Sequence, residues 1–172
     1  MSFSNLPIST EGLPEIQSVP MKPIHPDYLK TLRISWLIIF GIVLAVMITL
    51  YILINELQTG IAVAVASAVY VLAAVLTVVA GTRSFQRKKY AIRERDILYS
   101  TGWLFQNLHM VPFNRLQHCV VNIGPIERRF GLASISLYTA ASEGKDITLH
   151  GLKQEEAEKL KDLIMQQIQP MQ

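Results

Sequence analysis

Basic side chains are the groups in this sequence whose type and spacing best fit a chemical task. The first cluster, directly after an uncharged apolar segment, consists of Arg83, Arg87, Lys88 and Lys89, and a second set further along consists of Arg115, Arg128 and Arg129. Cations at a membrane boundary attract anionic lipids by roughly 1 kcal/mol per charge near the surface. Arginine forks also tie carbonyls or carboxylates around turns, and this structural role, here toward Glu127, is the first expectation for the second set. Both sets are candidate contacts for lipid or a partner.

The other reactive side chains show no catalytic or metal-binding pattern. The single cysteine, Cys119, cannot form an intramolecular disulfide, and its apolar neighbours predict a small buried side chain. The four histidines lack ligand-like spacing, and the sequence has no Gly-x-Ser-x-Gly, no phosphate-binding glycine loop and no paired-histidine helix. We therefore expect no enzyme, no cofactor and no metal site. Because the basic residues crowd the apolar segments, we also expect no nucleic-acid partner.

Two uncharged apolar segments, residues 36–54 and 61–80, must position these groups. Each has about the 20 residues that a helix needs to cross the hydrocarbon core of a bilayer. Two buried helices of a soluble protein would instead show a polar stripe. The break at residues 55–60 is short enough to predict an antiparallel turn. The sequence therefore predicts a transmembrane hairpin over residues 32–81.

Flanking charges orient this hairpin. Lys22, Lys30 and Arg33 precede the first segment, the basic cluster follows the second, and the connecting loop carries only Glu56. Cytoplasmic loops are enriched in Lys and Arg, so both chain termini are expected in the cytoplasm and the loop outside.

Small residues predict how the two helices associate. The candidate packing face consists of Gly41 and Ala45 on the first helix and Ala66 and Ala73 on the second. Small side chains let helix backbones approach closely in lipid. The hairpin could pack on itself in this way, or present this face to another membrane protein or a second copy. Neither segment contains an acidic, basic or histidine side chain, which argues against an ion or proton pathway.

After residue 82 the hydrophobic pattern changes to period two, which indicates short strands up to residue 149. From about residue 153 to 168 a helical stripe appears, formed by Ala157, Leu160, Ile164 and Ile168. The proline-rich residues 1–31 are predicted to form an irregular arm. The expected fold is thus a membrane α-hairpin followed by an α+β cytoplasmic domain over residues 82–172.

One stretch carries a family resemblance. Pro112, Arg115-Leu116-Gln117, Gly124-Pro125-Ile126, Arg128 and Gly131-Leu132 occur in this order behind the hairpin. The pattern resembles the bacterial pleckstrin-homology-like domain of the YdbS-type membrane proteins, and His25-Pro26 and Tyr28 extend the match before the first helix. The resemblance implies a split β-barrel, capped by the C-terminal helix, at the cytoplasmic face of a bacterial plasma membrane. It supplies no catalytic residues.

The functional hypothesis from the sequence is a non-enzymatic, membrane-tethered interaction or scaffold module. Its expected partners are the lipid bilayer and another membrane protein or a second copy. A small subunit of a transporter or channel is the alternative.

Overall fold

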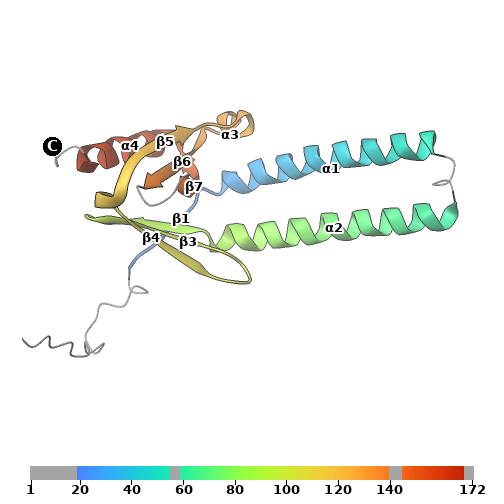
Figure 1. Ribbon diagram of the computed structural model, residues 1–172, viewed down its shortest axis with the longest axis horizontal. Helices are drawn as coiled ribbons and strands as arrows, with labels where there is room; N and C mark the ends of the chain where they lie inside the picture. Colours follow the sequence, from blue (N-terminus) through green and yellow to red (C-terminus); the bar gives the residue numbers. More distant parts are fainter. Residues whose placement is uncertain (1–18, 55–58, 140–144, 169–172) are drawn as a thin grey trace, which may run out of the picture.

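The computed structural model describes residues 19–54, 59–139 and 145–168, and shows two long helices joined to a β-rich domain at one end (Figure 1). Most of the loop predicted at residues 55–60 lies outside the described residues. So do residues 1–18 of the predicted arm.

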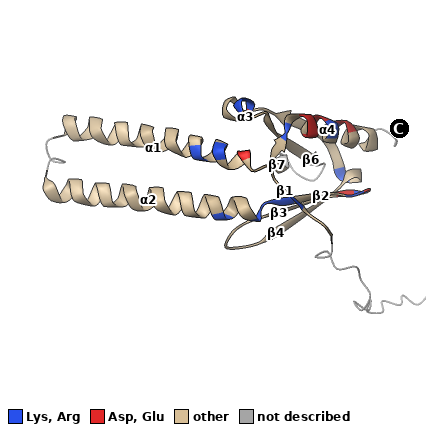
Figure 2. Cartoon of the chain, turned by 180° about the vertical axis from the view of Figure 1, so that it is seen from behind, with Lys and Arg blue, Asp and Glu red and all other residues tan. Residues whose placement is uncertain are grey.

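Helices α1 (Asp27–Leu53) and α2 (Gly60–Arg87) run side by side (Figure 1). No residue of the most apolar stretch of either helix is buried. Charged residues of the described chain gather at the domain ends of these helices, and the rest of both helices carries none (Figure 2). Water would not tolerate so much exposed apolar surface, so the two helices form the predicted membrane hairpin.

Large side chains of α1 meet α2 at two levels, one near the domain and one near the middle of the helices. The ring of Trp36 lies where a side chain at Gly81 would be, so glycine permits this contact. Further along, Phe40 and Tyr70 meet edge to face with ring centroids 5.9 Å apart, and the Tyr70 hydroxyl donates a hydrogen bond of 3.0 Å to the Phe40 carbonyl. The helices therefore contact each other through aromatic residues at the domain end and near their middle.

The first sheet lies at the domain end of α2 and continues from it (Figure 1). Its strands are β1 (Lys22–Pro23), β2 (Lys89–Ile92), β3 (Asp96–Thr101) and β4 (Asn107–Pro112), all antiparallel in this order. The sequence predicted an irregular arm where β1 lies and short strands directly after residue 82. In the structure β1 pairs with β2 across the hairpin, and α2 continues to Arg87.

The second sheet follows a short helical turn, η3 (Phe113–Arg115). Its strands are β5 (Leu116–Asn122), β6 (Leu132–Thr139) and β7 (Lys145–Lys153), antiparallel in the order β5-β6-β7. The short helix α3 (Pro125–Arg129) connects β5 to β6, and α4 (Gln154–Ile168) follows β7 directly. The strands predicted from the sequence ended at residue 149, whereas β7 continues through Gly151 to Lys153.

One hydrophobic core fills the space between the two sheets and α4. Ile97 and Val111 from the first sheet join Leu137 and Leu149 from the second. The predicted stripe of α4 enters the same core through Ala157, Leu160 and Ile164, which confirms the capping helix. The predicted split barrel needs one correction, because the two sheets do not close into a barrel. They meet at one corner, where the His25 amide donates a hydrogen bond of 2.8 Å to the Gly151 carbonyl.

Candidate functional site: the membrane-proximal face of the domain

Tyr28 in the first turn of α1 connects the membrane hairpin to the domain. Its ring is buried, 6.5 Å between centroids from Phe85 near the end of α2 and 5.8 Å from His150 on β7. The Lys88 ammonium lies 5.5 Å from the centroid of the same ring, and burial lowers the pKa of this lysine. A cation over an aromatic face is attracted by the ring quadrupole. One side chain thus holds both helices and the second sheet together.

Gly151 permits the close approach of β7 to Tyr28. Its φ is +72°, in the left-handed region that L-residues avoid. A Cβ built on Gly151 would lie 2.9 Å from both Cβ and Cγ of Tyr28. The sheet-to-helix junction therefore depends on a missing side chain.

A second connection joins the segment before the hairpin to α4. Lys22 Nζ lies 2.6 Å from Glu156 Oε1, and the Tyr90 hydroxyl donates a hydrogen bond of 2.7 Å to the same oxygen. Partial burial raises the pKa of Glu156, but the hydrogen bonds from Lys22 and Tyr90 outweigh it, so this pKa lies below its ordinary value. Burial and Glu156 together raise the pKa of Tyr90. The contact ties β1, β2 and α4 into one unit.

The basic cluster Arg83, Arg87, Lys88 and Lys89, at the end of α2, divides into two kinds of side chain. Arg83, Arg87 and Lys89 are exposed, at the level where α2 leaves the apolar region. Lys88 is half-buried and its ammonium is engaged by Tyr28. Three of the four predicted cations are therefore free to meet a lipid headgroup, and the fourth has a structural contact.

The second basic set is not brought together. Arg128 and Arg129 are exposed on α3, which packs beside the start of α1 (Figure 1). Figure 2 shows basic residues of α3 near the basic turns of α1, on the membrane-proximal side of the domain. Arg115 lies elsewhere, because η3 follows β4 at the end remote from the helices, where the Phe113 amide donates to the Arg95 carbonyl. Only two of the three arginines therefore belong to the membrane-proximal face.

Glu127 has a different partner from the one expected. Its Oε2 accepts a hydrogen bond of 3.0 Å from the Gly124 amide and so caps α3. Within the described residues, no ion pair joins Arg115, Arg128 or Arg129 to an acidic side chain. Because none is held by an acid of this chain, the arginines of α3 remain candidate contacts for an external anion.

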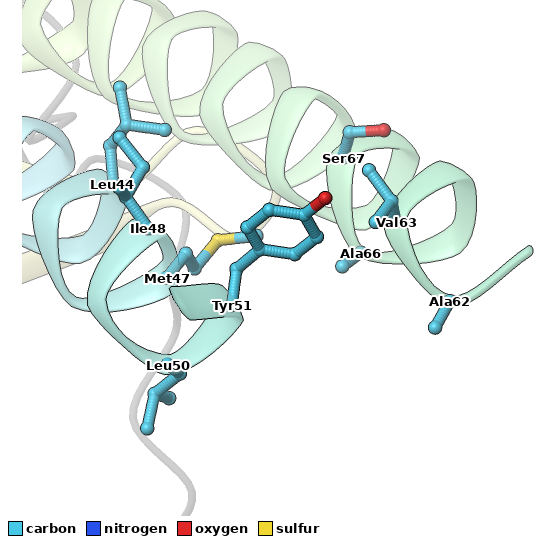
Figure 3. Close-up of a pocket in the computed structure, with 9 residues that line it drawn as sticks. All are labelled: Leu44, Met47, Ile48, Leu50, Tyr51, Ala62, Val63, Ala66 and Ser67. Carbon is cyan, nitrogen blue, oxygen red and sulfur yellow. The ribbon is translucent and has the colours of Figure 1, made fainter. Parts of the chain in front are cut away.

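The four candidate helix-packing residues do not form one contact surface between α1 and α2. Ala66 lines a groove of about 430 Å³ between the loop ends of the two helices, opposite Met47 and Tyr51 (Figure 3). A Cβ on Gly41 would meet nothing within 4 Å, and Ala45 and Ala73 are exposed. The aromatic contacts of Trp36 and Phe40, rather than Gly41 and Ala45, bring α1 against α2.

An unpaired sheet edge completes this part of the molecule. β4 is the last strand of the first sheet and pairs only with β3 among the described strands. Asn107 and His109 on this strand are exposed, and Leu108 and Met110 are each 45% exposed. An edge of this kind offers unpaired backbone groups to another strand.

The comparisons with known proteins agree on the architecture. The family model described as Bacterial PH domain matches residues 29–168, which includes nearly all of α1, the whole of α2 and the domain from β2 to α4. This chain belongs to the bacterial PH domain family. It is also 28% identical over 147 residues to transmembrane protein YdbS from Bacillus subtilis (strain 168), a match that covers 84% of this chain and 91% of YdbS. The predicted YdbS-type family is therefore confirmed.

A solved structure gives a more distant likeness. It is a protein of the DUF1696 family with a pleckstrin-homology domain, from Shewanella loihica PV-4. The match has 13% identity and a TM-score of 0.39, and covers 48% of this chain and 72% of the solved chain.

Several contacts of this bacterial PH domain were not predicted from the sequence. Lys22 stands in a proline-rich segment, and no local pattern relates it to Glu156, far along the chain. Cys119, in contrast, is buried in the core as its apolar neighbours predicted, and burial raises the pKa of its thiol. Among the described residues, no group of three or more His, Cys, Asp or Glu side chains could hold a metal ion.

Proposed function

We propose that this bacterial PH domain protein holds a partner at the cytoplasmic face of the plasma membrane and works without catalysis. The observation that carries the proposal is the exposed β4 edge, fixed beside a membrane hairpin through Tyr28 and β1. The partner is a membrane protein with an extended cytoplasmic segment, which adds to β4 as a further strand.

Strand addition fits the chemistry of this edge. An extended peptide gains main-chain hydrogen bonds from an open strand, and its alternate side chains contact the apolar groups beside it. Leu108 and Met110 supply such groups, and neither carries the charge with which many proteins protect their edges. The exposed cations Arg83, Arg87, Arg128 and Arg129 face the same membrane and would attract anionic headgroups around the complex.

Site-specific crosslinking tests this proposal in native membranes. A photoreactive amino acid at His109 on β4 should capture a partner, whereas the same amino acid at the exposed Lys161 of α4 should not. Met110→Lys should abolish capture, because a charge on the edge opposes strand addition. Val120→Lys on β5, where Val120 is 39% exposed, is the matched control that should leave capture intact. Equal capture from β4 and α4 would contradict the proposal.

The proposed contact between the membrane helices and a partner is tested by changing the size of a side chain. Ala73→Leu should weaken association with a membrane partner, because leucine replaces a small exposed side chain that lets another helix approach closely. Val69→Leu, at a position 60% exposed, is the control for added bulk. If purified protein in liposomes moved a solute and native extraction returned no complex, the alternative of a transporter or channel subunit would replace this proposal.

A further inference from the structure

The turn between β3 and β4 presents three consecutive apolar side chains. These residues, Trp103, Leu104 and Phe105, are here called the hairpin tip, and they are 38%, 74% and 76% exposed. The last register pair of the two strands is Thr101 with Asn107, so the tip lies beyond the paired part of the sheet. Single exposed apolar residues are ordinary on protein surfaces, but a continuous group of large ones marks an interaction site.

The hairpin tip lies next to the membrane helices. All three of its residues line the same hollow as Trp36 of α1 and Thr77, Ala80, Gly81 and Ser84 of α2. Both ribbon views show the β3–β4 turn extending past the domain end of α2 and alongside that helix (Figures 1 and 2). The tip therefore reaches the level at which α2 changes from apolar to basic sequence.

The position on α2 sets the depth of the tip. Thr77 and Ala80 precede Arg83 in α2, and a helix rises 1.5 Å per residue. Thr77 therefore lies roughly 9 Å further from the domain than Arg83, along the helix axis. Trp36 lies against Gly81 at the same level. Because α1 and α2 cross the bilayer, groups beside Trp36 and Ala80 occupy its cytoplasmic interface. Tryptophan favours that layer.

The composition of the β3–β4 hairpin suits the membrane interface. Residues 97–114 contain no Asp, Glu, Lys or Arg, so the tip enters the interface without removing any of these charged groups from water. The nearest charged positions on either side in sequence are Asp96 and Arg115, at the opposite ends of the two strands.

We propose that the hairpin tip inserts into the cytoplasmic interface of the bilayer as a third membrane contact beside α1 and α2. The tip and the hairpin helices together fix the tilt of the first sheet against the membrane. The inference stands independently of any partner at β4, because the lipid layer surrounding the helices is its only requirement.

Depth-dependent quenching tests the insertion on the full-length chain in lipid nanodiscs. With Cys119 replaced by Ala, Leu104→Cys is labelled with an environment-sensitive fluorophore. Glu94→Cys, in the exposed turn at the other end of β3, is the matched control. We expect lipids brominated in their acyl chains to quench the label at position 104 but not at position 94. Dissolved iodide should quench position 94 several-fold more strongly than position 104.

A second measurement needs no label. In Trp36→Phe, Trp103 is the remaining tryptophan, and brominated lipids should quench its emission. Iodide quenching at position 104 equal to that at position 94 would overturn the proposal. Protection in native membranes that disappears in nanodiscs would also overturn it, because a protein rather than lipid would then cover the tip.

Discussion

Gly151→Ala tests the junction between the hairpin and the domain. An L-residue in the left-handed region costs about 1–2 kcal/mol, and Gly151 has a φ of +72°. The new Cβ would also lie 2.9 Å from two carbons of Tyr28, and such overpacking adds about 1–3 kcal/mol. The expected loss in unfolding free energy is therefore about 2–5 kcal/mol.

Gly131→Ala is the matched control because it shares the backbone strain without the overlap. Gly131 has a φ of +61°, and a Cβ there would meet nothing within 4 Å. This variant should lose only about 1–2 kcal/mol. For a domain of this size, 1 kcal/mol corresponds to about 4–8 °C in Tm. Gly151→Ala should thus melt at least about 4 °C below Gly131→Ala.

The single cysteine provides the assay. Cys119 is buried in the core, so a thiol-reactive dye reports its exposure as the full-length protein is heated in nanodiscs. In a Tyr28→Gly background both overlapping carbons are removed, and Gly151→Ala should then cost no more than Gly131→Ala. Equal melting temperatures of the two glycine variants in the native background would refute the proposed contact with Tyr28.

The remaining predictions concern topology, core and charge. In a cysteine-free background, Gln58→Cys should react with an impermeant thiol reagent in intact cells; protection there, with labelling of a C-terminal cysteine, would reverse the topology. Leu160→Asp should unfold the domain, since a buried charge exceeds the roughly 2–5 kcal/mol cost of Leu→Ala, and unchanged circular dichroism melting would disprove this. Glu156→Gln should lower the free energy of unfolding by up to about 1 kcal/mol at pH 7 and by little in acid. The lowered pKa of Glu156 stabilises the folded protein above the ordinary value of 4.5, and this stability is lost as the pH falls through the pKa in the folded state. Melting temperatures measured over a range of pH check this. Replacing Arg128 and Arg129 with Gln should weaken co-purification of anionic lipids in a salt-dependent way, and lipid content that stays the same would exclude this contact.

Periodic hydrophobic patterns explain what the sequence could predict. Uncharged runs of about 20 residues identify a membrane helix without reference to the rest of the chain. The stripe of Ala157, Leu160 and Ile164 likewise determines one face of α4, and all three residues are buried. The alternating strands and the family resemblance extended this prediction to the PH-like fold, apart from the closure of the barrel.

Contacts between distant segments explain what the sequence could not predict. β1 is only two residues long and includes Pro23, so it has no period to detect and depends on β2 for its pairing. Whether two sheets close into a barrel depends on hydrogen bonds between them, which the residue pattern of a single strand does not reveal. The aromatic contacts between α1 and α2 depend on helix rotation, which a count of small residues does not determine.

The pairing of β1 with β2 makes the membrane hairpin an insertion within one folding unit. The first strand of the domain is synthesised before both membrane helices, and its partner is synthesised after them. The two ends of the hairpin must therefore emerge on the same side of the bilayer, whatever the flanking charges. The first sheet can be completed only after both helices have been synthesised. Removing the hairpin by starting the chain at residue 82 would also remove β1, Tyr28 and the Lys22 contact, so the domain is incomplete without the segment that precedes the hairpin.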